Sequence, residues 1–171
     1  MNYIFSAIFL YFFLGFLLYI FQRRIVFNKS GHPGSPKDYK LNNTEEVYIK
    51  TEDNLKLLSW YHKGNNSLPL LVYFHGNSFH IGDRAYRIQK YIEKNWSVLL
   101  VSWRGFGGNE GNPTEKNLYK DAEAVLKWIK NNTEFKFKEL VIYGESLGSG
   151  AAVEMGTKYE FLSIVLEAPF T

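Results

Sequence analysis

"VIYGESLGSG", residues 141–150, is the stretch of sequence that decides the fold. The apolar run at 139–143 has the length and composition of a short buried strand. Residues 151–155, which read AAVEM, continue as a good helix former. Ser146 therefore lies at a turn that leads from a strand directly into a helix.

The glycines around this serine have the spacing Gly144-x-Ser146-x-Gly148. A serine on so sharp a turn has a strained backbone, and glycine at both positions removes side chains that would clash with the facing strand and helix. The strain exposes the hydroxyl group, and the helix N-terminus offers N–H groups to a developing oxyanion. A turn whose serine only caps the helix is one alternative. A phosphate loop is another, but it needs a Gly-Lys-Ser/Thr sequence that is missing here. The pattern favours Ser146 as a nucleophile.

Strand and helix patterns alternate on both sides of this turn. Strands are expected at residues 47–50, 55–60, 68–74, 97–101, 139–143 and 162–166. Helices are expected at residues 81–94, after Thr114 as the N-cap, and after Ser146. The sequence therefore predicts an α/β fold, with a mostly parallel sheet covered by helices on both faces and opened by an antiparallel hairpin.

The loop after the predicted strand at 68–74 begins with His75-Gly76-Asn77. A loop at this position can supply a second oxyanion donor, for which the backbone N–H of Asn77 is the best candidate, alongside that of Leu147. His75 precedes the serine and is best interpreted as a structural histidine that ties down the loop. We expect Gly76 to support the loop in the same way.

A glycine-rich loop, WRGFGGNEGNP at residues 103–113, follows the predicted strand at 97–101. Gly105 and Gly107 match the start of a dinucleotide-binding fingerprint, but the third glycine falls at Gly111, one place too late, and Pro113 follows it. The pattern favours a structural loop beside the pocket over a nucleotide site.

The N-terminus is different in kind from the rest of the chain. Residues 3–21 contain no charge in nineteen positions, and at about 1.5 Å per residue they span about 28 Å, close to the hydrocarbon core of a bilayer. A cleavable signal peptide or a buried core helix are the alternatives, but no cleavage site is visible and the run is apolar on all faces. We therefore expect a transmembrane anchor at 1–24, a linker at 25–44 and a globular domain at 45–171.

The flanking charges predict the orientation of this anchor. Arg23, Arg24, Lys29 and Lys37 all follow the apolar run, and only the α-amino group precedes it. The positive-inside rule places the globular part in the cytoplasm, which makes the chain a single-pass membrane protein.

Composition excludes several classes of function. The chain of 171 residues has 46% hydrophobic residues and a formal net charge of only +3, with no basic stripe that would favour a nucleic-acid partner. It has no cysteine, which excludes disulfides, zinc-thiolate sites and a cysteine nucleophile. We expect no metal and no cofactor.

Taken together, these motifs resemble the α/β-hydrolase superfamily, and within it the small membrane-anchored serine hydrolases of the ABHD type. The resemblance covers about residues 51–171 and rests on four motifs in the family's order, YFHGN, RGFGGNEGNPTE, YGESLGSG and LEAPFT. It implies hydrolysis of an ester, thioester or amide of an acyl-type substrate through an acyl-enzyme. Ser146 is then the nucleophile, and Asn77 and Leu147 shape the oxyanion hole.

The chain departs from the family in its catalytic triad. The family order is serine, then acid, then histidine, but His32, His62, His75 and His80 all precede Ser146. We therefore expect a truncated hydrolase fold with an incomplete triad, an apolar sheet edge at residues 162–166, and a complementing C-terminal chain. A new triad of Ser146 with His80 and Asp83 is one alternative. A catalytically inactive, membrane-anchored binding protein with a hydrolase-like fold is another.

Overall fold

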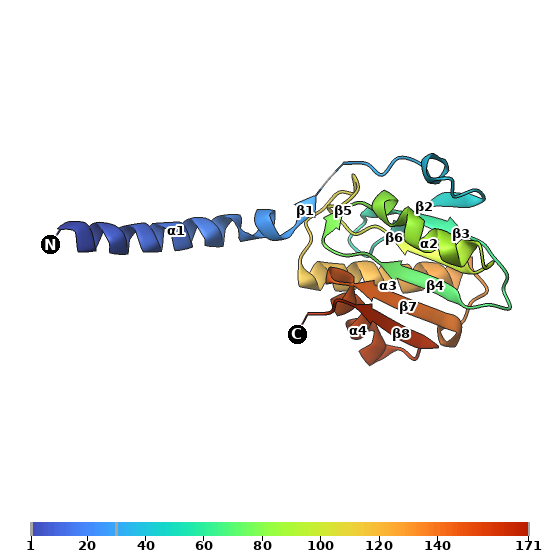
Figure 1. The fold of residues 1–171 in the computed structure, drawn as a ribbon. Coiled ribbons are helices and arrows are strands. Elements are labelled where there is room, and N and C mark those ends of the chain that lie inside the picture. The colour runs from blue at the N-terminus through green and yellow to red at the C-terminus, as the bar shows by residue number, and fades with distance from the viewer. Residues whose placement is uncertain (1, 30, 171) are drawn as a thin grey trace.

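The computed structural model describes residues 2–29 and 31–170. Met1, Ser30 and Thr171, which belong to the predicted anchor, linker and domain respectively, lie outside the described residues. Helix α1 (Asn2–Val26) projects from an α/β domain formed by the rest of the chain (Figure 1). The boundaries drawn from the sequence for these three parts stay predictions.

The main sheet of the domain has six strands in the spatial order β2-β3-β6-β4-β7-β8. Their bounds are β2 (Thr44–Lys50), β3 (Lys56–His62), β4 (Leu70–Phe74), β6 (Ser97–Val101), β7 (Leu140–Glu145) and β8 (Ser163–Glu167). Strands β6, β4, β7 and β8 run parallel to one another, whereas β2 and β3 form an antiparallel hairpin that joins the sheet through β6. The predicted mostly parallel sheet with an opening hairpin is confirmed.

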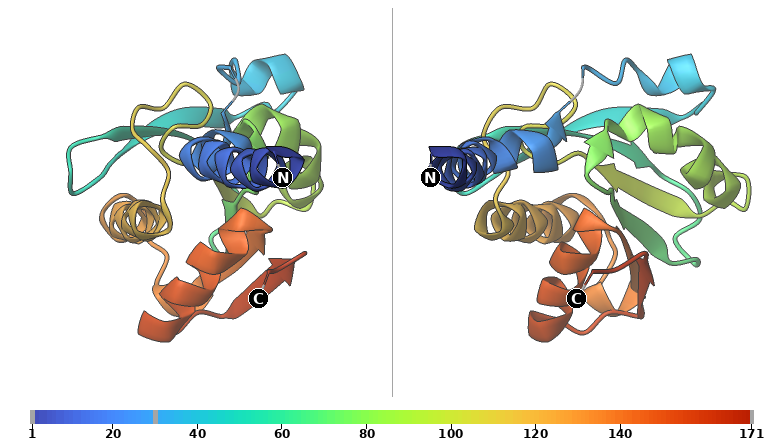
Figure 2. Two further views of the ribbon diagram at one scale, coloured as in Figure 1. Left: turned by 90° about the vertical axis from the view of Figure 1, so that its left-hand side faces the viewer. Right: turned by 60° about the vertical axis from the view of Figure 1, so that its left-hand side comes forward.

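Helices cover both faces of this sheet (Figure 2). Helix α2 (Ala85–Ile92) packs on one face, and helices α3 (Glu115–Asn132) and α4 (Leu147–Lys158) pack on the other. Because side chains alternate along a strand, Val72 of β4 belongs to the core under α3 and α4, whereas its neighbours Leu71 and Tyr73 belong to the core under α2. The central strands are therefore buried on both sides.

The helices begin and end at positions with clear local signals. The Thr114 hydroxyl accepts a hydrogen bond of 3.2 Å from the backbone N–H of Asn117, which confirms the predicted N-cap of α3. The helix predicted at 81–94 is shorter and consists of a 3₁₀ turn, η2 (Ile81–Arg84), followed by α2. Helix α2 ends at Ile92, and residues 93–95 form a closing turn in which Asn95 has a left-handed φ of +63° and the Trp96 N–H donates to the Tyr91 carbonyl at 3.1 Å.

Part of the predicted linker packs against the domain. It contains the 3₁₀ turn η1 (Pro36–Tyr39), and Leu41 just after it is only 1% exposed, in the core under α2. The stretch that reads as a spacer in the sequence is therefore anchored in the core under α2.

A further 3₁₀ turn, η3 (Phe137–Glu139), leads into β7.

A second, two-stranded sheet joins the N-terminal helix to the domain. Strand β1 (Asn28–Lys29) pairs in parallel with β5 (Ser78–Phe79), in the loop that follows β4. The sequence does not predict this pair, because two residues carry no readable periodicity. It places the end of α1 beside the loop that carries Asn77 (Figure 1).

Strand β8 lies at the edge of the sheet and has one strand neighbour, β7, within the described residues. Its apolar side chains Ile164, Val165 and Leu166 are each 38–39% exposed. An exposed apolar edge of this kind offers unpaired backbone groups to a further strand.

Candidate active site

Ser146 occupies the turn between β7 and α4 with a strained backbone. Its φ is +46° and its ψ is −109°, a combination that non-glycine residues rarely adopt. Two hydrogen bonds hold this conformation: the Ser146 N–H donates to the carbonyl of Glu167 at 2.8 Å, and the Ser149 N–H donates to the Ser146 carbonyl at 2.9 Å. These partners belong to β8 and α4, so elements of the fold support the strain.

The two glycines of the motif lie where no side chain fits. A Cβ atom at Gly144 would lie 2.7 Å from the Cα atom of Ser149 and 2.9 Å from the Cβ atom of Ala152. A Cβ atom at Gly148 would overlap the carbonyl group of Phe74 at the end of β4. The spacing of the motif thus follows from the close approach of α4 to strands β4 and β7.

The predicted oxyanion donors lie on two segments that meet at the turn. Leu147 is the first residue of α4, and within the described residues neither its N–H nor that of Asn77 has an acceptor. The loop of Asn77 runs directly over the turn, since a Cβ atom at Gly76 would lie 3.0 Å from the Glu145 carboxylate. Free N–H groups on neighbouring segments are available to an oxyanion, and the assignment of the two donors stays a prediction.

His75 is fully buried and ties the loop to its neighbour. Its Nδ1 lies 2.6 Å from the Gly76 carbonyl, and its Nε2 accepts a 3.4 Å hydrogen bond from the backbone N–H of Trp103. The indole of Trp103 donates in return to the His75 carbonyl at 2.8 Å. Burial, reinforced by the positive charge of Arg84, lowers the pKa of His75 to about 4. The ring is therefore neutral at pH 7. It donates a hydrogen bond to the Gly76 carbonyl through Nδ1 and accepts one from the Trp103 N–H through Nε2.

A charged pair beside Ser146 was missed by the sequence analysis. Arg84 donates two hydrogen bonds to the carboxylate of Glu145, at 2.8 and 3.1 Å, and a third to the carbonyl of Ser78 at 2.7 Å. The hydroxyl of Tyr73 donates to the same carboxylate at 2.9 Å. Burial alone would raise the pKa of Glu145, but the hydrogen bonds and charge of Arg84 outweigh it, and the pKa lies below its ordinary value. The sequence offered one signal for this pair, the acidic residue Glu145 at the end of an apolar strand.

His80 lies beside Asp83, as the alternative triad requires, with 3.2 Å between Nδ1 and the carboxylate but no hydrogen bond at Nδ1. In the part of the chain that the structure describes, however, no hydrogen bond reaches the hydroxyl of Ser146 from His80 or from any other group. His62 is engaged elsewhere, 3.2 Å from the hydroxyl of Thr44. The described residues thus bring no histidine into hydrogen-bond contact with the nucleophile candidate.

Arg104, near the start of the glycine-rich loop after β6, attaches this loop to α3 and to the hairpin turn. This guanidinium is 2% exposed and donates to Asp121 of α3 at 2.6 and 2.8 Å and to Asp53 of the hairpin turn at 2.7 and 3.1 Å. Positive φ values at Gly105, Gly107, Gly108 and Gly111 let the chain fold tightly over it.

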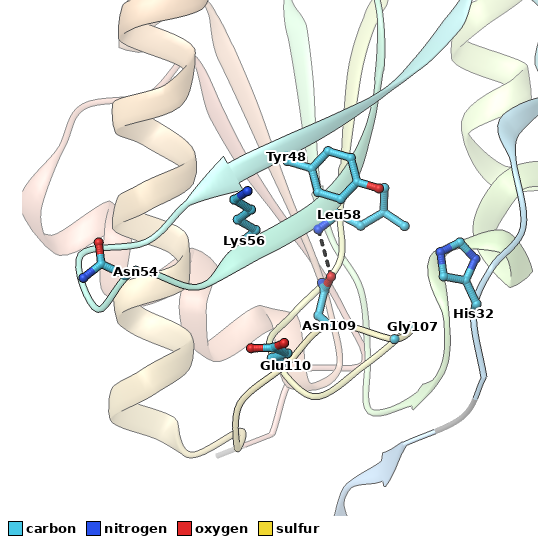
Figure 3. Close-up of a pocket in the computed structure, with 9 residues that line it drawn as sticks. His32, Tyr48, Asn54, Lys56, Leu58, Gly107, Asn109 and Glu110 are labelled. Carbon is cyan, nitrogen blue, oxygen red and sulfur yellow. Dashed lines mark hydrogen bonds between the residues drawn. The ribbon is translucent and has the colours of Figure 1, made fainter.

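A hollow of about 450 Å³ lies between this loop, the hairpin and His32 (Figure 3). The amide of Asn109 supports its floor by accepting from the Leu58 N–H at 2.8 Å, and Lys56 and Glu110 lie along its wall. None of the predicted site residues lines it. Within residues 2–29 and 31–170, no three His, Asp or Glu side chains gather as a metal site would require.

Comparison with known proteins decides the family. A family model described as "Serine aminopeptidase, S33" matches residues 66–171, more than half of the chain. The chain belongs to this family of α/β-hydrolases. Its fold is similar to the Pyrococcus furiosus esterase Pf2001, with a TM-score of 0.70 and 27% identity over 83% of this chain and 58% of that one.

Two relatives extend the comparison. The chain is 30% identical to an uncharacterized membrane protein of Saccharomyces cerevisiae, over 90% of this chain and 56% of the relative. It is 29% identical to the lysophosphatidylserine lipase ABHD12 of Danio rerio, over 80% of this chain and 42% of the relative. The chain spans about half the length of the curated relatives it matches.

These comparisons support hydrolase chemistry for the family fold. They also agree with an N-terminal helix that is long and apolar enough to cross a membrane, at Tyr3–Gln22, none of which is buried in the structure. This exposure argues against the alternative of a core helix.

Proposed function

We propose that this chain carries the nucleophile and the oxyanion hole of a serine hydrolase that cleaves an ester, thioester or amide bond through an acyl-enzyme. The observation that carries the proposal is the turn at Ser146, with its φ of +46°, its unengaged hydroxyl and two glycines that admit no side chain. A structural turn has no need of a strained serine at this point.

The chemistry follows from the arrangement of the turn. The Ser146 oxygen adds to the acyl carbon of the substrate while a base removes the hydroxyl proton. The negative charge that develops on the carbonyl oxygen is stabilised by the N–H groups of Asn77 and Leu147 and by the N-terminus of α4. Collapse of this intermediate returns the proton to the leaving group and leaves an acyl ester on Ser146, which water then hydrolyses.

The described residues do not supply the general base that would take the proton of the Ser146 hydroxyl. A serine hydroxyl without an adjacent base is a weak nucleophile, and in a serine protease the loss of the triad histidine costs a factor of about 10⁶ in kcat. We propose that the acid and the histidine come from a complementing C-terminal chain that docks along β8. The exposed apolar side chains of β8, 38–39% exposed from Ile164 to Leu166, suit such a partner.

The proposal includes attachment to a lipid bilayer through residues 3–21 of α1. The apolar length of this helix supports a single membrane span, and the basic residues that follow it favour a cytoplasmic domain. Glycosylation mapping with acceptor sites added to the domain tests this orientation, because modification of the domain would place it in the lumen.

Chemical rescue tests the catalytic proposal without knowledge of the partner. The full chain in detergent is treated with a fluorophosphonate probe, with and without added imidazole, and compared with Ser146→Ala. We expect slow labelling of Ser146 that imidazole accelerates, because a free base can take the position of a triad histidine. Gly148→Ala, which blocks the turn, serves as a structural control.

Two results would contradict the proposal. Labelling that survives in Ser146→Ala would assign reactivity to another side chain. A folded wild-type chain that stays unlabelled at every imidazole concentration would favour the alternative, a membrane-anchored binding protein with a hydrolase-like fold.

A further inference from the structure

The junction between α1 and the domain is short and firmly attached. Helix α1 ends at Val26, and β1 begins two residues later at Asn28. The intervening Phe27 packs edge-on against the ring of Phe106, with 6.4 Å between ring centroids. Phe106 is itself buried and lies 5.4 Å from the ring of His75. The helix is therefore joined to the scaffold of the candidate site without a free spacer.

The second attachment is the pairing of β1 with β5. Asn28 is in register with Ser78, and Lys29 with Phe79, directly after the proposed oxyanion residue Asn77. Arg84 holds the same strand from the interior through the Ser78 carbonyl, at 2.7 Å. The loop that carries Asn77 is thus clamped between the core and the segment that leaves the helix (Figure 1).

Phe79 combines two features that are unusual for an aromatic residue. Its φ is +62°, in the left-handed region that bulky residues avoid, and its side chain is 52% exposed. A left-handed backbone at a bulky residue costs about 1–3 kcal/mol, and strain of this kind is concentrated at functional contacts. Strand β5 lies at the end of the domain from which α1 projects (Figure 1).

The length of the junction sets the distance of this ring from the bilayer. Beyond Gln22, four helical residues add about 6 Å, and Phe27 and Asn28 add about 7 Å, so that β1 begins at most about 13 Å beyond the hydrocarbon edge. The headgroup region on one side of a bilayer is about 5–8 Å thick. Phe79, one register position along β5, therefore lies at most about 11 Å beyond the headgroup region, and a tilt of α1 brings β5 closer to the lipid interface.

We infer that the segment Ser78–Phe79 rests on the lipid surface, with the Phe79 ring inserted among the headgroups beside α1. Aromatic rings favour this interfacial layer, and the sequence places Arg23, Arg24 and Lys29 next to it, where cations attract anionic headgroups. The loop over Ser146 is then a second membrane contact, and the candidate site faces the bilayer. This inference rests on the proposed anchoring by α1.

The absence of cysteine from the chain gives a direct test. Single cysteines are introduced as Phe79→Cys, as Lys138→Cys in the exposed turn before β7, and as Gly15→Cys within α1. Each is labelled with an environment-sensitive fluorophore in the full chain, reconstituted in nanodiscs of phosphatidylcholine with a minority of phosphatidylglycerol. Ser78→Cys, a change of oxygen to sulfur, is a second reporter in case Phe79→Cys does not fold.

Lipids that carry a spin-label quencher near the headgroup then report contact. We expect the labels at positions 79 and 78 to be quenched by these lipids at least about twofold more than the label at position 138. Quenching at position 15 with none at 79 and 78 would overturn the inference while leaving the anchor intact. Position 15 lies about 10 Å inside the span and is therefore probed with lipids that carry the quencher on the acyl chain, and absence of quenching by these lipids would remove the anchor, and the inference with it.

Discussion

Arg104 and Arg84 are both buried, ion-paired side chains near the carboxyl ends of the central strands, yet they join different kinds of groups. Arg104 lies between two carboxylates, on α3 and on the hairpin turn, and thereby links three segments of the scaffold. Arg84 binds a single carboxylate, Glu145, and donates a further hydrogen bond to the Ser78 carbonyl in the loop of the proposed oxyanion hole. The first cluster holds the domain together, whereas the second aligns the loop with the serine turn.

Removal of Arg104 is expected to have the largest effect. Arg104→Ala leaves the fully buried carboxylate of Asp121 without its cation, and the loss of one partner of a buried pair costs about 3–5 kcal/mol of unfolding free energy. Urea titration of the full chain in detergent, followed by tryptophan fluorescence, measures this loss.

Arg87→Ala is a matched control for this change. Arg87 also pairs with a glutamate, Glu167, but its side chain is 32% exposed, and the expected loss is below about 1 kcal/mol. Equal losses in the two variants would mean that burial does not set the contribution of these ion pairs to stability.

The sequence predicted the parts of this arrangement that depend on local patterns. The serine turn is readable because Gly144 and Gly148 lie within two residues of Ser146, and the N-cap at Thr114 is readable from its position before an amphipathic run. The Arg84–Glu145 pair joins residues 61 positions apart, and no local pattern reports such a contact. The β1–β5 pair is hidden for the same reason and because its strands are short.

His75 sharpens the comparison, because burial and then the positive charge of Arg84 lower its pKa. Its pKa is about 4 in the folded chain and has a reference value of 6.5. Below pH 6.5 the unfolded chain binds a proton that the folded chain does not. The free energy of unfolding therefore decreases by about 1.4 kcal/mol for each unit that the pH is lowered, until pH 4. Above pH 6.5 the group contributes no pH dependence.

The full fall between pH 6.5 and pH 4 is about 3 kcal/mol. We expect His75→Asn to be less stable than the wild type at pH 7, with a smaller loss on acidification, in urea titrations at a series of pH values. The difference between the two curves isolates His75 from Glu145 and the other carboxyl groups. Parallel curves would show that the ring is protonated with an ordinary pKa in the folded state.

Arg84→Lys is expected to have the smallest effect on stability and the most local one. Lysine keeps the positive charge beside Glu145 but loses the planar fork that reaches two carboxylate oxygens and the Ser78 carbonyl together. The unfolding free energy should fall by only about 1 kcal/mol, because a charge still neutralises the carboxylate. The pH dependence due to His75 should remain, since the neighbouring charge is unchanged.

The loop, in contrast, should lose its fixed position in Arg84→Lys. Amide hydrogen exchange should accelerate in the peptide that covers residues 75–80 and stay unchanged in α3, where Arg104 provides the cross-link. Imidazole-assisted labelling of Ser146 should slow as well, because the N–H of Asn77 is no longer held over the turn. Uniform acceleration of exchange throughout the domain would instead give Arg84 the same scaffold role as Arg104 and would erase the distinction between the two clusters.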